Sequence, residues 1–182
     1  NKVKNNIPIM IGVDHSSTGG VIEALAEKVG RDNLSVILLD SHSDFIPMEI
    51  RYNALQHYRE KINWKPDPNF YDPFADRRPE TYNVGSFLFH LIKDGTVLPE
   101  KVAFVGVSDK PPKFTKEKDQ RILDFLSFYH GIEAQGMKII SKQDITTKGP
   151  KKALNPIKKL MNSKYVYVSV DIDVGANSAI FG

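Results

Sequence analysis

Short, almost continuously apolar runs alternate along this chain with longer stretches in which apolar residues recur every third or fourth position. Short apolar runs are typical of strands in parallel sheets, which are covered on both faces. The runs expected to form strands are Ile7–Ile11, Leu34–Leu39, Lys101–Val107, Met137–Ile140 and Tyr165–Val170. The stretches expected to form helices are Thr18–Val29, Val84–Lys93, Lys118–Gln135 and Pro150–Met161. This alternation predicts an α/β fold with a parallel sheet.

One region interrupts the alternation. Between about residues 62 and 80 the chain carries four prolines together with several Asp and Asn residues, which is the composition of a loop. We interpret this stretch as an insertion, which lies either on the surface or as a lid near the mouth of a site. The sequence contains no internal repeat, so we expect a single domain over residues 1–182.

Composition narrows the functional classes. The 25 basic and 22 acidic side chains nearly balance, and no basic face interleaved with aromatic residues is evident, so we expect no nucleic-acid partner. No apolar stretch approaches the roughly 20 residues that span a bilayer, so we expect no membrane partner. Cysteine is absent, which excludes thiolate metal sites and fits a cytoplasmic location. The first residue is Asn1, from which we expect a chain cut at both ends.

Candidate chemistry lies in three short clusters, each of which follows an apolar run. They are Val13-Asp14-His15-Ser16, Asp40-Ser41-His42-Ser43-Asp44 and Ser169-Val170-Asp171-Ile172-Asp173. In a strand, residues two apart face the same side, and the carboxyl ends of parallel strands meet at one edge of the sheet. We therefore expect two imidazoles and four carboxylates to converge, from His15, Asp40, His42, Asp44, Asp171 and Asp173.

The charges of this set indicate what it binds. Four ionised carboxylates in one place repel one another, and burying them unpaired costs several kcal/mol each. Two divalent cations cancel those charges, and oxygen and imidazole donors suit manganese. Two such ions about 3.5–4 Å apart generate hydroxide at neutral pH and polarise an electrophile. With a hydroxide included the cluster stays slightly negative, which favours a cationic small-molecule substrate.

The clusters resemble the metal-binding signature of the arginase/agmatinase (ureohydrolase) family. That family carries Gly-Gly-Asp-His-Ser, Asp-Ala-His-x-Asp and Ser-x-Asp-x-Asp in this order. The resemblance implies a three-layer α/β/α fold with a mostly parallel sheet, hydrolysis of guanidino groups to urea and an amine, and assembly into trimers or hexamers. It also implies two manganese ions per chain. One would be held by His15, Asp40, Asp44 and Asp171, and the other by Asp40, His42, Asp171 and Asp173.

The proton donor is less clearly marked, and one motif departs from the family. His57 lies thirteen residues after Asp44, as the shuttle does in arginases, and we predict this role for it. A second alignment instead matches Tyr82–Phe87 to the family's His-Gly-x-Pro-Phe segment and puts Asn83 in the histidine position. After Asp173 the family continues with Asp-Pro, whereas this chain does not. The leading prediction is a binuclear manganese hydrolase of a guanidino or related C–N bond, with Asp44 orienting the hydroxide.

Three alternatives stay open. A metal-binding protein of the same fold that lacks catalysis would fit the altered segment after Asp173. A zinc amide deacylase on the same fold would use one ion, held by an Asp-x-His and one further Asp, which leaves His15, Asp44 and Asp173 without a purpose. A nucleotide-binding domain is suggested by Gly19-Gly20 at a helix start, but the chain has no glycine-rich phosphate-binding motif.

Overall fold

The computed structural model describes residues 9–12, 14–65 and 82–175. Within these residues the strands form one parallel sheet in the order β3-β2-β1-β4. The strands are β1 (Leu34–Leu39), β2 (Val102–Val107), β3 (Lys138–Ser141) and β4 (Tyr165–Val170). Four of the five predicted strands are therefore confirmed, and the two strands that precede the second and third clusters, β1 and β4, are paired.

The remaining predicted strand, Ile7–Ile11, is wrong over the part that the structure describes. Residues 9–12 form no strand, and Ile9 and Ile11 are 87% and 95% exposed. Ile7 and Pro8 lie outside the described residues, as do residues 66–81, which include most of the predicted insertion. The strand β1 is paired with β2 on one side and with β4 on the other, and residues 9–12 pair with none of the four strands. An apolar run without a strand partner gains no ladder hydrogen bonds.

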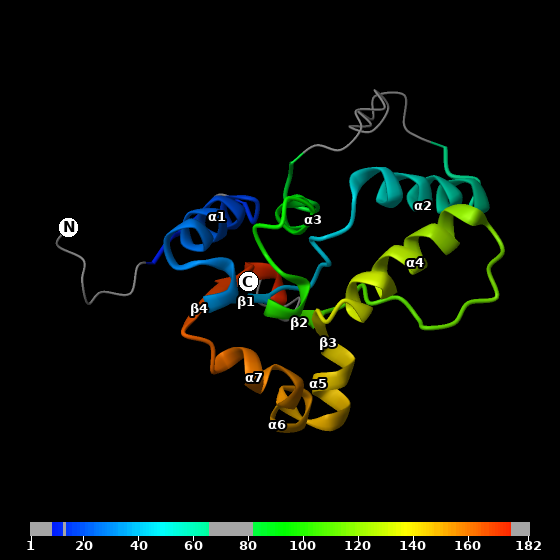
Figure 1. Cartoon of the computed structure of the whole chain (residues 1–182). Coiled ribbons are helices and arrows are strands. Elements are labelled where there is room, and N and C mark those ends of the chain that lie inside the picture. The colour runs from blue at the N-terminus through cyan, green and yellow to red at the C-terminus, as the bar shows by residue number, and fades with distance from the viewer. Residues whose placement is uncertain (1–8, 13, 66–81, 176–182) are drawn as a thin grey trace.

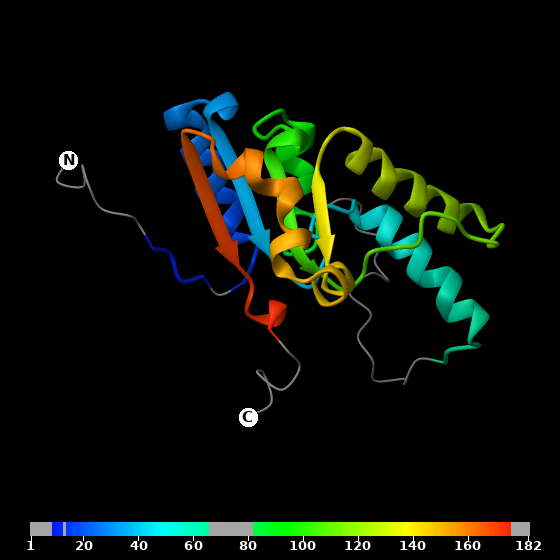
Figure 2. The same ribbon diagram turned by 90° about the horizontal axis from the view of Figure 1, so that it is seen from below.

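Helices cover both faces of the sheet, which confirms the three-layer α/β/α fold (Figures 1 and 2). One face carries α1 (Ser17–Val29), α3 (Phe87–Lys93) and α4 (Gln120–Ala134), and α2 (Met48–Lys61) packs against α4 farther from the sheet. The opposite face carries α5 (Lys142–Lys148), α6 (Pro150–Ala153) and α7 (Lys158–Met161). Short 3₁₀ turns span Arg31–Asn33, Pro99–Lys101, Asn155–Ile157 and Ile172–Val174.

The alternation of side chains in β1 explains the two apolar cores. Val36 and Leu38 belong to the larger core under α1, α3 and α4, whereas Ile37 between them belongs to the smaller core under α6 and α7. Successive strand residues point to opposite faces, so a strand that is apolar throughout contributes to both cores. The polar residues that follow the strands are thereby held at the edge of a rigid sheet.

The helix predictions need three corrections. The predicted helix Pro150–Met161 divides into α6, a 3₁₀ turn and α7, because Pro156 lacks the N–H that a helix interior needs. Helices α2 and α5 were not predicted as regular elements. Ala54 is the only fully buried residue of α2, so its sequence shows a weak apolar face.

Among the residues that the structure describes, no helix is long and apolar enough to cross a membrane.

Candidate metal centre

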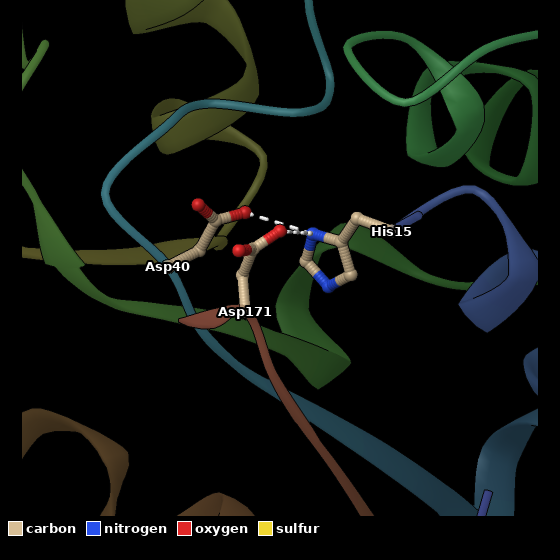
Figure 3. A group of neighbouring side chains, drawn as sticks. All are labelled: His15, Asp40 and Asp171. Carbon is tan, nitrogen blue, oxygen red and sulfur yellow. Dashed lines mark ion pairs between the residues drawn. The ribbon is translucent and has the colours of Figure 1, made fainter. Parts of the chain in front are cut away.

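The site lies where β1 and β4 end and α1 begins (Figure 3). Two backbone hydrogen bonds continue the sheet beyond the strand ends. The Asp40 N–H donates to the Val105 carbonyl at 3.0 Å, and the Asp171 N–H donates to the Leu39 carbonyl at 2.8 Å. These bonds set Asp40 and Asp171 side by side. Both face His15, which lies in the turn that precedes α1.

Three carboxylates converge on one nitrogen of His15. Its Nδ1 lies 2.9 Å from Oδ2 of Asp40, 2.9 Å from Oδ2 of Asp44 and 3.6 Å from Oδ2 of Asp171. The side chains of His15, Asp40 and Asp44 are only 3%, 1% and 5% exposed. This half of the site gathers one imidazole and three carboxylates, of which only Asp171, at 23% exposure, is partly open to solvent.

A second group shares Asp40 with the first. Nδ1 of His42 lies 2.6 Å from Oδ2 of Asp173 and 3.9 Å from Oδ1 of Asp40. Two sets of potential ligand atoms, each within 4.8 Å of one another, are thus present, namely His15, Asp40 and Asp171, and Asp40, His42 and Asp173. All six residues that the sequence marked as ligands therefore lie in one place.

The donor set fits divalent cations. Oδ2 of Asp40 is buried and accepts no hydrogen bond of good geometry, even though Nδ1 of His15 is near. A buried carboxylate oxygen without a partner is costly, and a cation would satisfy it. Every donor in the set is a carboxylate oxygen or an imidazole nitrogen, which suits hard or borderline divalent ions such as manganese.

Proton binding reflects the crowding of negative charge. Burial disfavours the charged form of His15, but the carboxylates of Asp40 and Asp44 outweigh it and raise the pKa of His15 to about 10. Burial raises the pKa of Asp44 to about 6, against the lowering by its hydrogen bond with His15, and the charge of Asp40 adds to the rise. Without metal, the positive charge at the centre is therefore carried by a protonated His15.

The remaining contacts of His15 fix its ring. Nε2 lies 3.1 Å from Oγ of Ser169 in β4, and the same hydroxyl lies 2.8 Å from Oγ1 of Thr18 in α1. The ring packs edge-on against Phe87, with 5.2 Å between centroids. Because Nε2 faces Ser169, Nδ1 is turned toward the carboxylates, which is how outer contacts orient a histidine ligand.

The loop over residues 40–44 alternates candidate ligands with anchoring serines. The N–H of Ser41 donates to Oδ1 of Asp173 at 3.1 Å, and its hydroxyl donates to the Asp173 carbonyl at 2.7 Å. Ser43 donates through its N–H and its hydroxyl to the two carboxylate oxygens of Asp109, at 3.2 and 2.7 Å. The hydrogen bonds of the two serines therefore anchor the loop between its candidate ligands.

Sequence reasoning missed the residues that hold this loop from outside. Nη2 of Arg51 in α2 donates to the carbonyls of Ser43 and Gly85, at 2.8 and 3.3 Å. Asp109 follows β2 and Lys142 begins α5, and both contact the loop. Asp109 and Lys142 lie far along the chain from the loop, and Arg51 lies in the helix that follows it. None of them belongs to a motif, so only the tertiary structure reveals them.

The structure does not bring His57 into contact with the clustered ligands. It lies on α2, where Nδ1 is 3.0 Å from Oδ2 of Asp119 and Nε2 is 3.4 Å from Oε2 of Glu117. Asn83, the position favoured by the second alignment, accepts a hydrogen bond from the Gly85 N–H within its own turn, at 2.9 Å. The shuttle role of His57 stays a prediction.

The fold and the site together define a class, the α/β proteins that gather Asp and His side chains at the carboxyl edge of a parallel sheet. Within that class, the model of the arginase family matches residues 2–180. This match covers nearly the whole sequence. The chain belongs to the arginase family.

This chain resembles longer proteins, and each match covers most of this chain but less than half of the relative. Proclavaminate amidinohydrolase of Streptomyces clavuligerus is 26% identical over 166 residues, which are 91% of this chain and 40% of that protein. Its solved structure matches with a TM-score of 0.57 at 24% identity, covering 93% of this chain and 41% of that chain. Formimidoylglutamase of Bacillus subtilis has a TM-score of 0.55 at 17% identity, covering 94% and 41%. This chain thus spans about 40% of the length of the curated relative.

Proposed function

We propose that this chain carries the two-manganese centre of a hydrolase that cleaves a guanidino or related C–N bond. The observation behind the proposal is that Asp40 belongs to both groups of candidate ligands. A carboxylate shared between two groups is what holds two ions close enough to act on one substrate. Membership of the arginase family and the similarity to an amidinohydrolase support the same chemistry.

The ligand assignment combines the two groups with the contact of Asp44 with His15 and with the resemblance to the family. His15, Asp40, Asp44 and Asp171 would hold the first ion, and Asp40, His42, Asp171 and Asp173 the second. When bound, the ions would supply Lewis acidity and lower the pKa of a water molecule. Asp40 would serve both ions because it belongs to both groups, and Asp171 is assigned to both ions by the resemblance to the family.

The protein residues themselves define how a substrate would approach. The side chain of His42 is 57% exposed and that of Asp173 is 25% exposed, whereas His15 is buried. A substrate would therefore reach the centre from the side of His42. Asp44 would accept a hydrogen bond from the attacking water, and its contact with His15 in the buried group supports this role. Four carboxylates around the centre favour a cationic substrate.

A second candidate function is metal binding without catalysis. The placement of His57 against Asp119 and Glu117 favours it, since no histidine outside the ligand set has been brought to the centre within the described residues. The segment after Asp173 also departs from the family motif. A single-zinc deacylase is disfavoured, because two ligand groups are present instead of one. Trimeric or hexameric assembly and a cytoplasmic location stay predictions.

Turnover distinguishes these functions. Protein loaded with manganese is incubated with a panel of guanidino and amidino compounds, and released urea, ammonia and amine are quantified. We expect product from at least one cationic compound and none from Asp40→Asn, which removes one charge shared by both ions. Bound manganese without any product would support the non-catalytic alternative, and equal product from both proteins would exclude this centre as its source.

A further inference from the structure

The two halves of the centre are held in different ways. The side chains of His15, Asp40 and Asp44 are at most 5% exposed, so packing restricts them. The side chains of His42 and Asp173 are 57% and 25% exposed, so packing restricts them far less. The exposed half must therefore be positioned by hydrogen bonds, since an exposed side chain otherwise keeps its rotamer freedom.

One ammonium group connects the two segments that carry this exposed half. Nζ of Lys142 donates to Oγ of Ser41 at 2.6 Å and to the carbonyl of Gly175 at 3.4 Å. Ser41 immediately precedes His42, and its hydroxyl passes the connection on to the carbonyl of Asp173 at 2.7 Å. Lys142 thus bridges the loop after β1 and the turn after β4.

Lys142 itself starts from a fixed point. It is the first residue of α5, directly after β3. The preceding residue, Ser141, forms a capping box with Asp144, in which the Asp144 N–H donates to Oγ of Ser141 at 3.0 Å. Strand and cap together fix the backbone of Lys142. Its side chain can therefore restrain the loop over residues 40–44 instead of moving with it.

We propose that Lys142 is a positioning residue for the second metal position, formed by Asp40, His42 and Asp173. This inference rests on the proposed function, because it assigns Lys142 a role in a centre that binds two ions. The side chain supplies hydrogen bonds to Ser41 and Gly175 from outside the ligand set. The first position, around His15, is held by packing instead, because the side chains of His15, Asp40 and Asp44 are at most 5% exposed.

Manganese titration tests the assignment. Binding is followed by calorimetry, and electron paramagnetic resonance distinguishes a coupled pair of ions from an isolated ion. The variants are Lys142→Met, which removes the donors, and Lys142→Arg, which retains donors at similar reach. Lys148→Met is the matched control, since Lys148 is in the same helix and its Nζ contacts Asp144 instead of the centre.

We expect Lys142→Met to weaken the second binding event about tenfold or more, as the loss of outer contacts to ligands generally does, with the first event unchanged. With two equivalents of manganese added, the resonance of Lys142→Met should be that of an isolated ion. Lys142→Arg should recover much of the signal of the coupled pair. Equal weakening of both events, or the same effect in Lys148→Met, would overturn the role of Lys142. If Lys142→Met does not fold, Ser41→Ala removes the same relay and should give the same selective loss.

The two proposals fail separately. An unaltered protein that binds two ions, together with a Lys142→Met variant that binds them equally well, refutes only the positioning role. An unaltered protein that binds fewer than two ions refutes the two-manganese centre and, with it, a second position for Lys142 to support.

Discussion

Gly106 allows β2 to pass close to the loop that carries Asp40. It has a φ of +103° and lies at the irregularity in the β2–β3 pairing between Val105 and Val107. A Cβ atom at this position would lie 2.6 Å from Cγ2 of Val174 and 3.2 Å from the Asp40 carbonyl oxygen. Gly106→Ala therefore perturbs the backbone of β2 and both segments that hold candidate ligands.

The expected effect has two parts. A positive φ is unfavourable for a residue with a Cβ by about 1–2 kcal/mol. Forcing a methyl group into close-packed surroundings adds about 1–3 kcal/mol. Together they should lower the free energy of unfolding by about 2–5 kcal/mol. The displaced neighbour would be Val174 or the Asp40 backbone, so manganese affinity should fall as well.

Urea unfolding of the metal-free protein, followed by circular dichroism, measures this change. Gly20→Ala is the matched control, because Gly20 lies in α1 and a Cβ there meets nothing within 4 Å. That variant should gain about 0.5–1 kcal/mol from its better helix propensity. A free energy of unfolding for Gly106→Ala within about 0.5 kcal/mol of that of the unaltered protein would be less change than either part alone predicts. That result would contradict the close approach of β2 to Asp40.

Three further predictions concern residues around the centre. The metal-free protein should lose stability as pH rises. The raised pKa of His15 contributes stability that is full below its ordinary pKa of 6.5 and is lost as the pH approaches about 10. Melting temperatures after chelation should therefore fall between pH 6.5 and 9, and His15→Gln should flatten that fall. Arg51→Met should lower the free energy of unfolding by about 1–3 kcal/mol, since the carbonyls of Ser43 and Gly85 lose a charged donor, and an unchanged urea midpoint would contradict this. His57→Gln should leave the bound manganese unchanged, because His57 contacts Asp119 and Glu117; elemental analysis showing lost metal would place it in the centre.

The sequence predicted the part of the fold that depends on local pattern. Apolar runs located the four strands, and polar residues after β1 and β4 located five of the six candidate ligands, because strand ends in a parallel sheet converge whatever the intervening helices do. The run at Ile7–Ile11 misled, since a strand requires a neighbour and apolarity alone does not provide one.

The outer contacts of the centre could not be predicted in the same way. Arg51, Asp109 and Lys142 each reach the loop over residues 40–44 from a different element. Such contacts depend on how helices dock on the sheet, which no local spacing encodes. Spacing likewise fixes only the distance of His57 along the chain, whereas the direction of α2 decides that its ring contacts Asp119.

The number of manganese ions per chain is the most direct test of the centre. Elemental analysis is applied to protein that has been loaded with manganese and then dialysed, beside an Asp171→Ala variant prepared in the same way. Two ions per chain in the unaltered protein, largely lost in the variant, are expected, since Asp171 lies 3.6 Å from His15 within the cluster and is assigned to both ions. One ion per chain, or none, would contradict the two-manganese centre.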